Sequence, residues 1–242
     1  MQLARMNKKT YSELWGEEPK QLADQGIYAA LANETPDGNV LEIGCGSGLS
    51  TSYLASTRSV LSIENNEHLV GLANTYLASK GIATSIVHAD LFSLSEKEID
   101  EIRAFSPKVI ACWFIGSHPD DVDKNTPSSL AITERPKKYR ENIEDLLLTE
   151  RLCQPTVDWI HLANRVGVIE SVSEHDIIEA TKDDYNTHLF SSNGFEITSV
   201  KVIDWQRNGS NFMYVNAHNP NLMPGNLVPR VISVLAKRIR SA

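Results

Sequence analysis

Residues 40–48 read Val-Leu-Glu-Ile-Gly-Cys-Gly-Ser-Gly, which combines an apolar run with a glycine-rich segment. The apolar run at 40–43 is typical of a short buried strand, and the apolar residues at 49–56 recur with helical spacing. Between them lie three alternate glycines, which can adopt positive φ and allow close approach to the backbone because they carry no Cβ. The stretch therefore predicts a strand, a glycine-rich loop and a helix.

The same alternation continues on the C-terminal side of the loop. Further strands are predicted at 59–64, 83–88, 109–114 and 165–171, and helices at 67–80, 95–105, 155–164 and 173–191. Parallel strands need crossover connections, so this order predicts a parallel sheet that is covered by helices.

The chain is predicted to end its sheet with a hairpin. Runs at 195–205 and 211–218 alternate apolar and polar residues, and the segment between them contains Asn208-Gly209, a favoured hairpin turn. The fold class is therefore α/β, a doubly wound, mostly parallel seven-stranded sheet with an antiparallel C-terminal hairpin and helices on both faces.

Three regions follow from this order. Residues 1–36 are predicted to form an N-terminal helical cap, 37–218 the main domain, and 219–242 a basic, amphipathic helical tail. Within the main domain, the polar segment 117–150 is longer than an ordinary connection and is predicted to be a lid or substrate insertion.

The composition indicates a globular protein with an acidic surface. The net charge of −8 over 242 residues disfavours nucleic acid as a partner, because affinity for phosphates depends on Lys and Arg. No apolar run reaches the roughly 20 residues of a membrane span, and the first residues lack the apolar centre of a signal peptide. We therefore expect a cytoplasmic protein without membrane insertion. Cys45, Cys112 and Cys153 are widely spaced, which predicts reduced thiols and no zinc site.

Acidic residues follow the first three predicted strands at regular places. Glu42 stands just before the glycine loop, Glu64 ends the second strand, and Asp90 follows the third. An acid about 20 residues beyond a glycine loop can accept hydrogen bonds from both hydroxyls of a ribose.

This pattern resembles the first motifs of the class I S-adenosylmethionine (SAM)-dependent methyltransferases. The resemblance covers residues 10–218 and implies that SAM is the cofactor of a methyltransferase domain at 37–218. Glu42 would bind the amino end of the methionine, Glu64 the ribose, and Asp90 and Leu91 the adenine, and Asn65 is a further cofactor-binding residue. The loop would contribute Gly44, Cys45, Gly46 and Gly48, and Tyr11 and Trp15 would lie on a helix that folds over the cofactor.

Other interpretations of the loop remain open. A nicotinamide dinucleotide site needs the spacing G-x-G-x-x-G, and here Leu49 takes the place of the last glycine. The glycines could also form only a tight turn between a strand and a helix. A protein that binds SAM as a sensor or scaffold, without catalysis, is a further alternative.

The methyl acceptor is expected to meet the residues that follow the fourth strand. His118 is the candidate general base, because the imidazole pKa lies near neutral pH, and Asp120 could orient it. Trp113 and Phe114 are predicted to wall the substrate pocket. A magnesium site at His118, Asp120 and Asp121 is the less favoured alternative, because adjacent carboxylates on a polar loop are more often solvated, so no metal is predicted.

The acceptor itself is not specified by the sequence. Methyltransferases that act on DNA bases often carry Asn/Asp-Pro-Pro-Tyr/Phe after the fourth strand, and residues 113–118 depart from it. The expected acceptor is an oxygen or nitrogen of a small molecule or peptide. The charged cluster at 134–140 could recruit an acidic acceptor, or it is a solvated surface.

Overall fold

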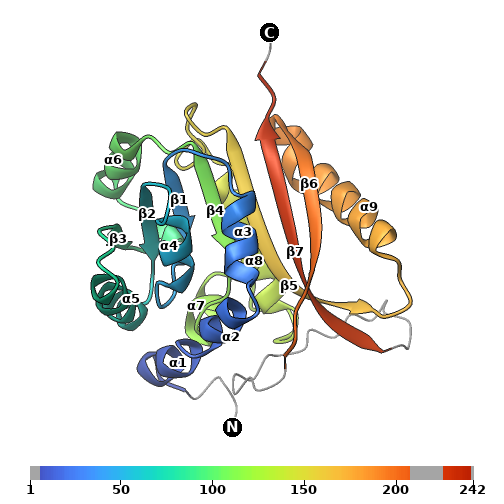
Figure 1. Cartoon of the computed structure of the whole chain (residues 1–242), viewed down its shortest axis with the longest axis horizontal. Helices are drawn as coiled ribbons and strands as arrows, with labels where there is room; N and C mark the ends of the chain where they lie inside the picture. The colour runs from blue at the N-terminus through green and yellow to red at the C-terminus, as the bar shows by residue number, and fades with distance from the viewer. Residues whose placement is uncertain (1–5, 208–225, 241–242) are drawn as a thin grey trace.

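A computed structural model describes residues 6–207 and 226–240. Its centre is one seven-stranded sheet in the order β3-β2-β1-β4-β5-β7-β6 (Figure 1). Strands β1 to β5 run parallel, and β7 pairs antiparallel with both β5 and β6. The α/β class, the mostly parallel sheet and its antiparallel end are thereby confirmed. The strands are β1 (Val40–Ile43), β2 (Val60–Glu64), β3 (Ser85–His88), β4 (Val109–Trp113), β5 (Trp159–Ile169), β6 (Phe195–Asp204) and β7 (Leu227–Arg238).

Helices cover both faces of the sheet. The α-helices are α1 (Lys8–Trp15), α2 (Glu18–Asp24), α3 (Ile27–Glu34), α4 (Leu49–Leu54), α5 (Glu67–Ser79), α6 (Glu96–Phe105), α7 (Pro119–Lys124), α8 (Arg135–Leu147) and α9 (Glu174–Tyr185). The short turns are η2 (Leu91–Ser93), η3 (Asn186–Phe190) and η4 (Ser191–Asn193). In Figure 1, α3 and α4 lie in front of the sheet, and α1 and α2 lie at its lower end. None of the helices in the described ranges is long and apolar enough to cross a bilayer.

The central strands separate two apolar layers. Side chains of β1, β2 and β4 alternate between the faces, so that Val40 and Trp113 pack with α2 to α4 while Leu41 and Cys112 pack with α6 and α8. Every residue of β1, β2 and β4 is buried, as expected for parallel strands covered on both faces. This rigid centre holds the loops that follow β1, β2 and β4.

The predicted helical tail is wrong, because β7 is a strand that lies between β5 and β6. Residues 231–236 are all buried and, apart from Ser233, apolar, and the period of such a run does not distinguish a strand from a helix. The same ambiguity explains β5, which begins at Trp159, within a segment predicted to be helical. The second predicted strand of the hairpin, 211–218, lies outside the described residues, and the observed partner of β6 is β7.

The predicted lid contains an ordinary crossover helix. Helix α8 connects β4 to β5, and its Ile143 and Leu147 are buried in the core. Within the predicted N-terminal cap the structure describes α1, α2 and α3, and Ile27 and Leu31 of α3 are fully buried against the sheet.

Candidate cofactor site

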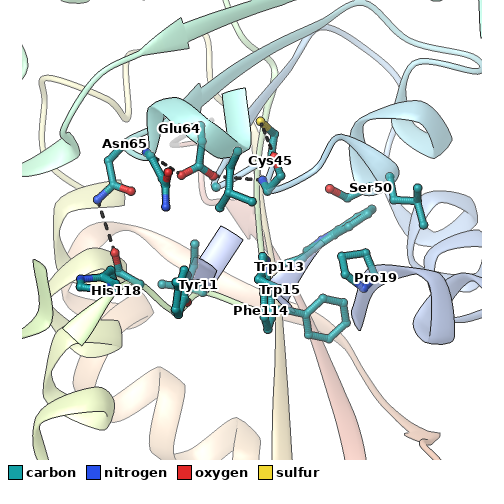
Figure 2. A pocket seen from close by; sticks show the side chains of 18 of the residues that line it. Tyr11, Trp15, Pro19, Cys45, Ser50, Glu64, Asn65, Trp113, Phe114 and His118 are labelled. Atoms are coloured by element: carbon teal, nitrogen blue, oxygen red, sulfur yellow. Dashed lines mark hydrogen bonds between the residues drawn. The ribbon is translucent and has the colours of Figure 1, made fainter. Parts of the chain in front are cut away.

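A cavity lies where β1, β2 and β4 end, beneath α1. The loop after β1 contributes Gly44, Cys45 and Gly46 to its wall, and the corner after β2 contributes Glu64 and Asn65. Further wall residues are Tyr11, Trp15, Pro19, Tyr28, Asn66, Trp113, Phe114, Ser117 and His118. Figure 2 shows Glu64 and Asn65 on one side of the cavity, and Trp15, Trp113 and Phe114 on the other.

The glycine loop needs its glycines for two reasons. Gly44, Gly46 and Gly48 have φ of 76°, 53° and 87°, a region that side chains rarely adopt. A Cβ on Gly48 would lie 3.1 Å from the Cα of Ala73, and a Cβ on Gly46 would lie 3.2 Å from Trp15 Nε1. The loop therefore packs tightly against α5 on one side and against α1 on the other.

Glu64 projects from the end of β2 into this loop. Its Oε2 accepts a hydrogen bond from the backbone N–H of Gly46 at 3.0 Å, and its Oε1 accepts one from the N–H of Asn66 at 3.0 Å. Burial raises the pKa of the carboxyl to about 7, although these backbone donors oppose the shift. Each oxygen keeps a lone pair for a ligand hydroxyl, because a carboxylate oxygen can accept more than one hydrogen bond.

Glu42 has a different environment from the one predicted for it. Its side chain does not line the cavity, and its oxygens accept hydrogen bonds from Ser50, Thr51 and Ser62 at 2.6, 2.6 and 2.7 Å. Burial also raises the pKa of this carboxyl. In this structure the carboxyl joins β1 to β2 and α4 beneath the loop, and the contact of Glu42 with the methionine stays a prediction.

The predicted adenine residues also lie outside the cavity. Asp90 accepts from the N–H of Phe92 and forms an ion pair with Lys124 at 2.9 Å, so it caps the turn after β3. Hydrogen bonding to Lys124 lowers the pKa of Asp90 against the effect of its partial burial. Leu91 is buried in the core beside it.

His118 lines the cavity, but its ring nitrogens are both engaged. Nε2 lies 2.6 Å from the carbonyl oxygen of Met6 and must donate to it, while Nδ1 accepts the N–H of Asp120 at 3.3 Å. A base needs a free lone pair, so a general-base role for His118, which stays a prediction, requires the contact between Nδ1 and Asp120 to open. Asp120 does not line the cavity, and its side chain is 74% exposed.

The chain resembles known proteins in its fold and not in its sequence. No protein-family model matches the chain, and no curated protein resembles its sequence. Among solved structures, TYW2 from M. jannaschii in complex with AdoMet aligns with a TM-score of 0.50 and 14% identity, over 92% of this chain and 77% of that one. A SAM-dependent methyltransferase from Aquifex aeolicus aligns with a TM-score of 0.50 and 11% identity, over 97% and 100%. The chain has the class I, Rossmann-like methyltransferase fold.

In this methyltransferase fold, helix α1 closes the cavity. Tyr11 and Trp15 form part of its wall, and only about 40 Å³ of it is open to a water-sized molecule, whereas ligand pockets usually hold 300 Å³ or more. Polar contacts hold the N-terminal segment against the start of α7: the bond from His118 to Met6, and an ion pair of 3.0 Å between Lys8 and Asp121. The open space beneath α1 is therefore smaller than a nucleoside.

The aromatic side of the cavity is tightly packed. The Trp113 ring stacks on Tyr28 at 6.4 Å between centroids, and it meets His161 edge-on at 5.3 Å. Phe114 has a positive φ of 57°, a strained value for an aromatic residue, where the chain turns out of β4. Trp113 and Phe114 thus line the cavity, at the place where the sequence analysis expected the acceptor.

Sequence analysis missed Asn66 and Tyr28 as cavity residues. Asn66 accepts from the N–H of His68 and caps α5, a role that its position before Glu67 could have revealed. Tyr28 reaches the cavity from α3, and no sequence signal distinguishes it from other buried residues of that helix. Over the described residues, no group of three or more metal-ligating side chains is close enough to hold an ion.

Proposed function

We propose that this chain is a SAM-dependent methyltransferase that acts on an oxygen or nitrogen of a small molecule or peptide. The main support is Glu64, which faces the cavity from the end of β2 with a lone pair on each oxygen beside a bare glycine loop. A carboxylate in this place suits the two hydroxyls of a ribose. Bound SAM would supply an electrophilic methyl group on a sulfonium.

The role of the protein in this reaction is mainly alignment. Methyl transfer is an in-line substitution: the acceptor lone pair forms the new bond to carbon, and the electrons of the broken bond stay on sulfur. Among the described wall residues, the His118 imidazole and the Glu64 carboxylate are the candidate general bases, and both already have hydrogen-bond partners. This favours an acceptor with a lone pair available at neutral pH, such as a carboxylate oxygen or an aromatic nitrogen.

A direct test uses methyl-labelled SAM and size-fractionated cell extract. Label should enter a small-molecule or peptide fraction, and the product S-adenosylhomocysteine should accumulate in equal amount. A matched Glu64→Ala protein controls for enzymes carried over from the preparation. Label in RNA or DNA would overturn the proposed acceptor class, which also rests on the net charge of −8.

The closed cavity favours a second candidate, a protein that binds SAM as a sensor. In that case α1 would report cofactor binding by its movement, and no acceptor would be needed. Binding of S-adenosylhomocysteine without label transfer to any fraction would support this candidate. Absence of any binding would contradict both.

Movement of α1 should be visible in the fluorescence of Trp15. Because Trp15 Nε1 lies against the glycine loop, S-adenosylhomocysteine should change the tryptophan emission of the wild type, and Trp15→Phe should lose at least half of the change. If α1 must open first, the binding rate measured by stopped flow should level off at high ligand concentration. A rate that rises linearly with concentration would show that the cavity is already open.

A further inference from the structure

Two buried polar groups in the cavity wall lack a hydrogen-bond acceptor. Asn66 Nδ2 and Trp113 Nε1 have no partner among the described residues, and their residues are 3% and 6% exposed. Folded proteins rarely leave buried donors unpaired, because each costs part of the free energy of folding. Both residues line the same cavity, so one ligand could satisfy both donors.

The sheet places these donors at different ends of the cavity. Asn66 follows β2 and Trp113 ends β4, and β1 lies between those two strands. With neighbouring strands about 4.8 Å apart, the two positions are roughly 10 Å apart. The glycine loop after β1 lies between them, and Figure 2 shows Trp113 across the cavity from Glu64.

Both donors are held in place before any ligand arrives. The Oδ1 of Asn66 accepts from the N–H of His68 at 3.1 Å, which fixes the plane of the amide. The indole of Trp113 is confined between the rings of Tyr28 and His161. Neither side chain can turn easily to find another partner.

We propose that these two donors recognise the two ends of the cofactor, with Asn66 binding a ribose hydroxyl and Trp113 binding the methionine carboxylate. This rests on the proposed function. A hydroxyl both donates and accepts, so it can donate to Glu64 while it accepts from Asn66 Nδ2. An indole N–H only donates, so at the other end it pairs with the carboxylate of the methionine and not with its ammonium group.

The test compares two ligands that differ only at the methionine end. S-adenosylhomocysteine carries the amino and carboxylate groups, and 5′-methylthioadenosine lacks both. Trp113→Phe keeps an aromatic ring and removes the N–H. We expect calorimetry to show that Trp113→Phe lowers the affinity for S-adenosylhomocysteine about ten-fold, because a hydrogen bond to a charged acceptor is among the stronger ones. The affinity for 5′-methylthioadenosine should change by less than two-fold.

Asn66→Ser is the matched variant for the other end. Serine is a favoured helix cap, so the start of α5 is kept while the amide donor is lost. This variant should lower the affinity for both ligands by a similar factor, about five-fold to ten-fold, because both ligands carry the ribose. Neither substitution removes a hydrogen bond made by the donor in the ligand-free protein, so the melting temperatures of both should stay within a few degrees of the wild type.

Each remaining outcome counts against a specific claim. If Trp113→Phe lowered the affinity for both ligands equally, the ring would act through packing. If the variant left both affinities unchanged, the proposed contact of the indole N–H with the carboxylate would be wrong. If Asn66→Ser left the affinity unchanged, the proposed contact of Asn66 with the ribose would be wrong. If the wild-type protein bound neither ligand, the proposed function itself would fail, and this inference with it.

Discussion

Replacing Glu64 by glutamine is expected to weaken the binding of S-adenosylhomocysteine at least ten-fold, the largest effect on ligand affinity that we predict. The carboxylate accepts from Gly46 and Asn66 and, in the proposed complex, also from the ribose hydroxyls. Glutamine replaces one acceptor oxygen by an NH₂ group, which then faces the backbone N–H of Gly46 or Asn66, a donor against a donor. Hydrogen bonds to a charged group contribute about 1.5–3 kcal/mol each, and 1.4 kcal/mol corresponds to ten-fold in affinity. Calorimetry at pH 8 measures the difference.

The raised pKa of Glu64 makes this binding depend on pH. With a pKa of about 7 in the ligand-free protein, the carboxyl is half protonated at neutral pH. The ribose hydroxyls donate to the charged form, so affinity should rise between pH 6 and pH 8 in the wild type. In Glu64→Gln the affinity should change little over this range. A flat profile in the wild type, or an equal slope in both proteins, would contradict the assignment of Glu64 to the ribose.

The same group affects folding stability with a defined sign. Its pKa is raised from 4.5 to about 7 in the folded state, so the folded protein holds the proton more tightly than the unfolded chain does. Its contribution to stability is therefore complete below pH 4.5 and is lost as the pH rises through about 7. The loss is of the order of 3 kcal/mol. Ligand that binds the charged carboxylate would offset this loss.

The sequence predicted which residues lie at the carboxyl ends of the parallel strands, but it did not predict what those residues contact. Glu64 and His118 line the cavity because each stands at or just after the end of a parallel strand, and chain order alone brings those ends to one edge. The contact of His118 with Met6 spans 112 positions of the chain. No local pattern could reveal it, so the engaged state of the ring was not predictable.

The wrong secondary-structure prediction for the C-terminal tail arose because its strand is buried on both faces. In β7, residues 231–236 are all buried, which removes the alternation that marks a strand exposed on one side. The parallel strands β1, β2 and β4 are equally buried, but the glycine loop and the regular alternation with helices identified them. The position of β7 between β5 and β6 depends on long-range pairing and has no comparable local signal.

Replacing Glu42 by alanine should cost about 3–5 kcal/mol of folding stability, the largest effect on stability that we predict. The carboxyl is 3% exposed and accepts hydrogen bonds from Ser50, Thr51 and Ser62, which come from α4 and β2. Alanine leaves three buried hydroxyls without this acceptor and opens a cavity, and losses of this kind are among the most severe for single substitutions. Urea unfolding at pH 7 gives the free energy directly.

Glu42→Gln is the matched control, because it keeps the shape of the side chain and one acceptor oxygen. It should lose about half as much stability as Glu42→Ala, and the folded fraction of either variant should bind S-adenosylhomocysteine within about three-fold of the wild type. The opposite result, normal stability with lost affinity, would show that Glu42 contacts the cofactor as the sequence resemblance implied. Comparing Glu42 with Glu64 therefore separates a carboxylate that builds the glycine loop from one that faces the ligand, although the two stand in similar places at the ends of neighbouring strands.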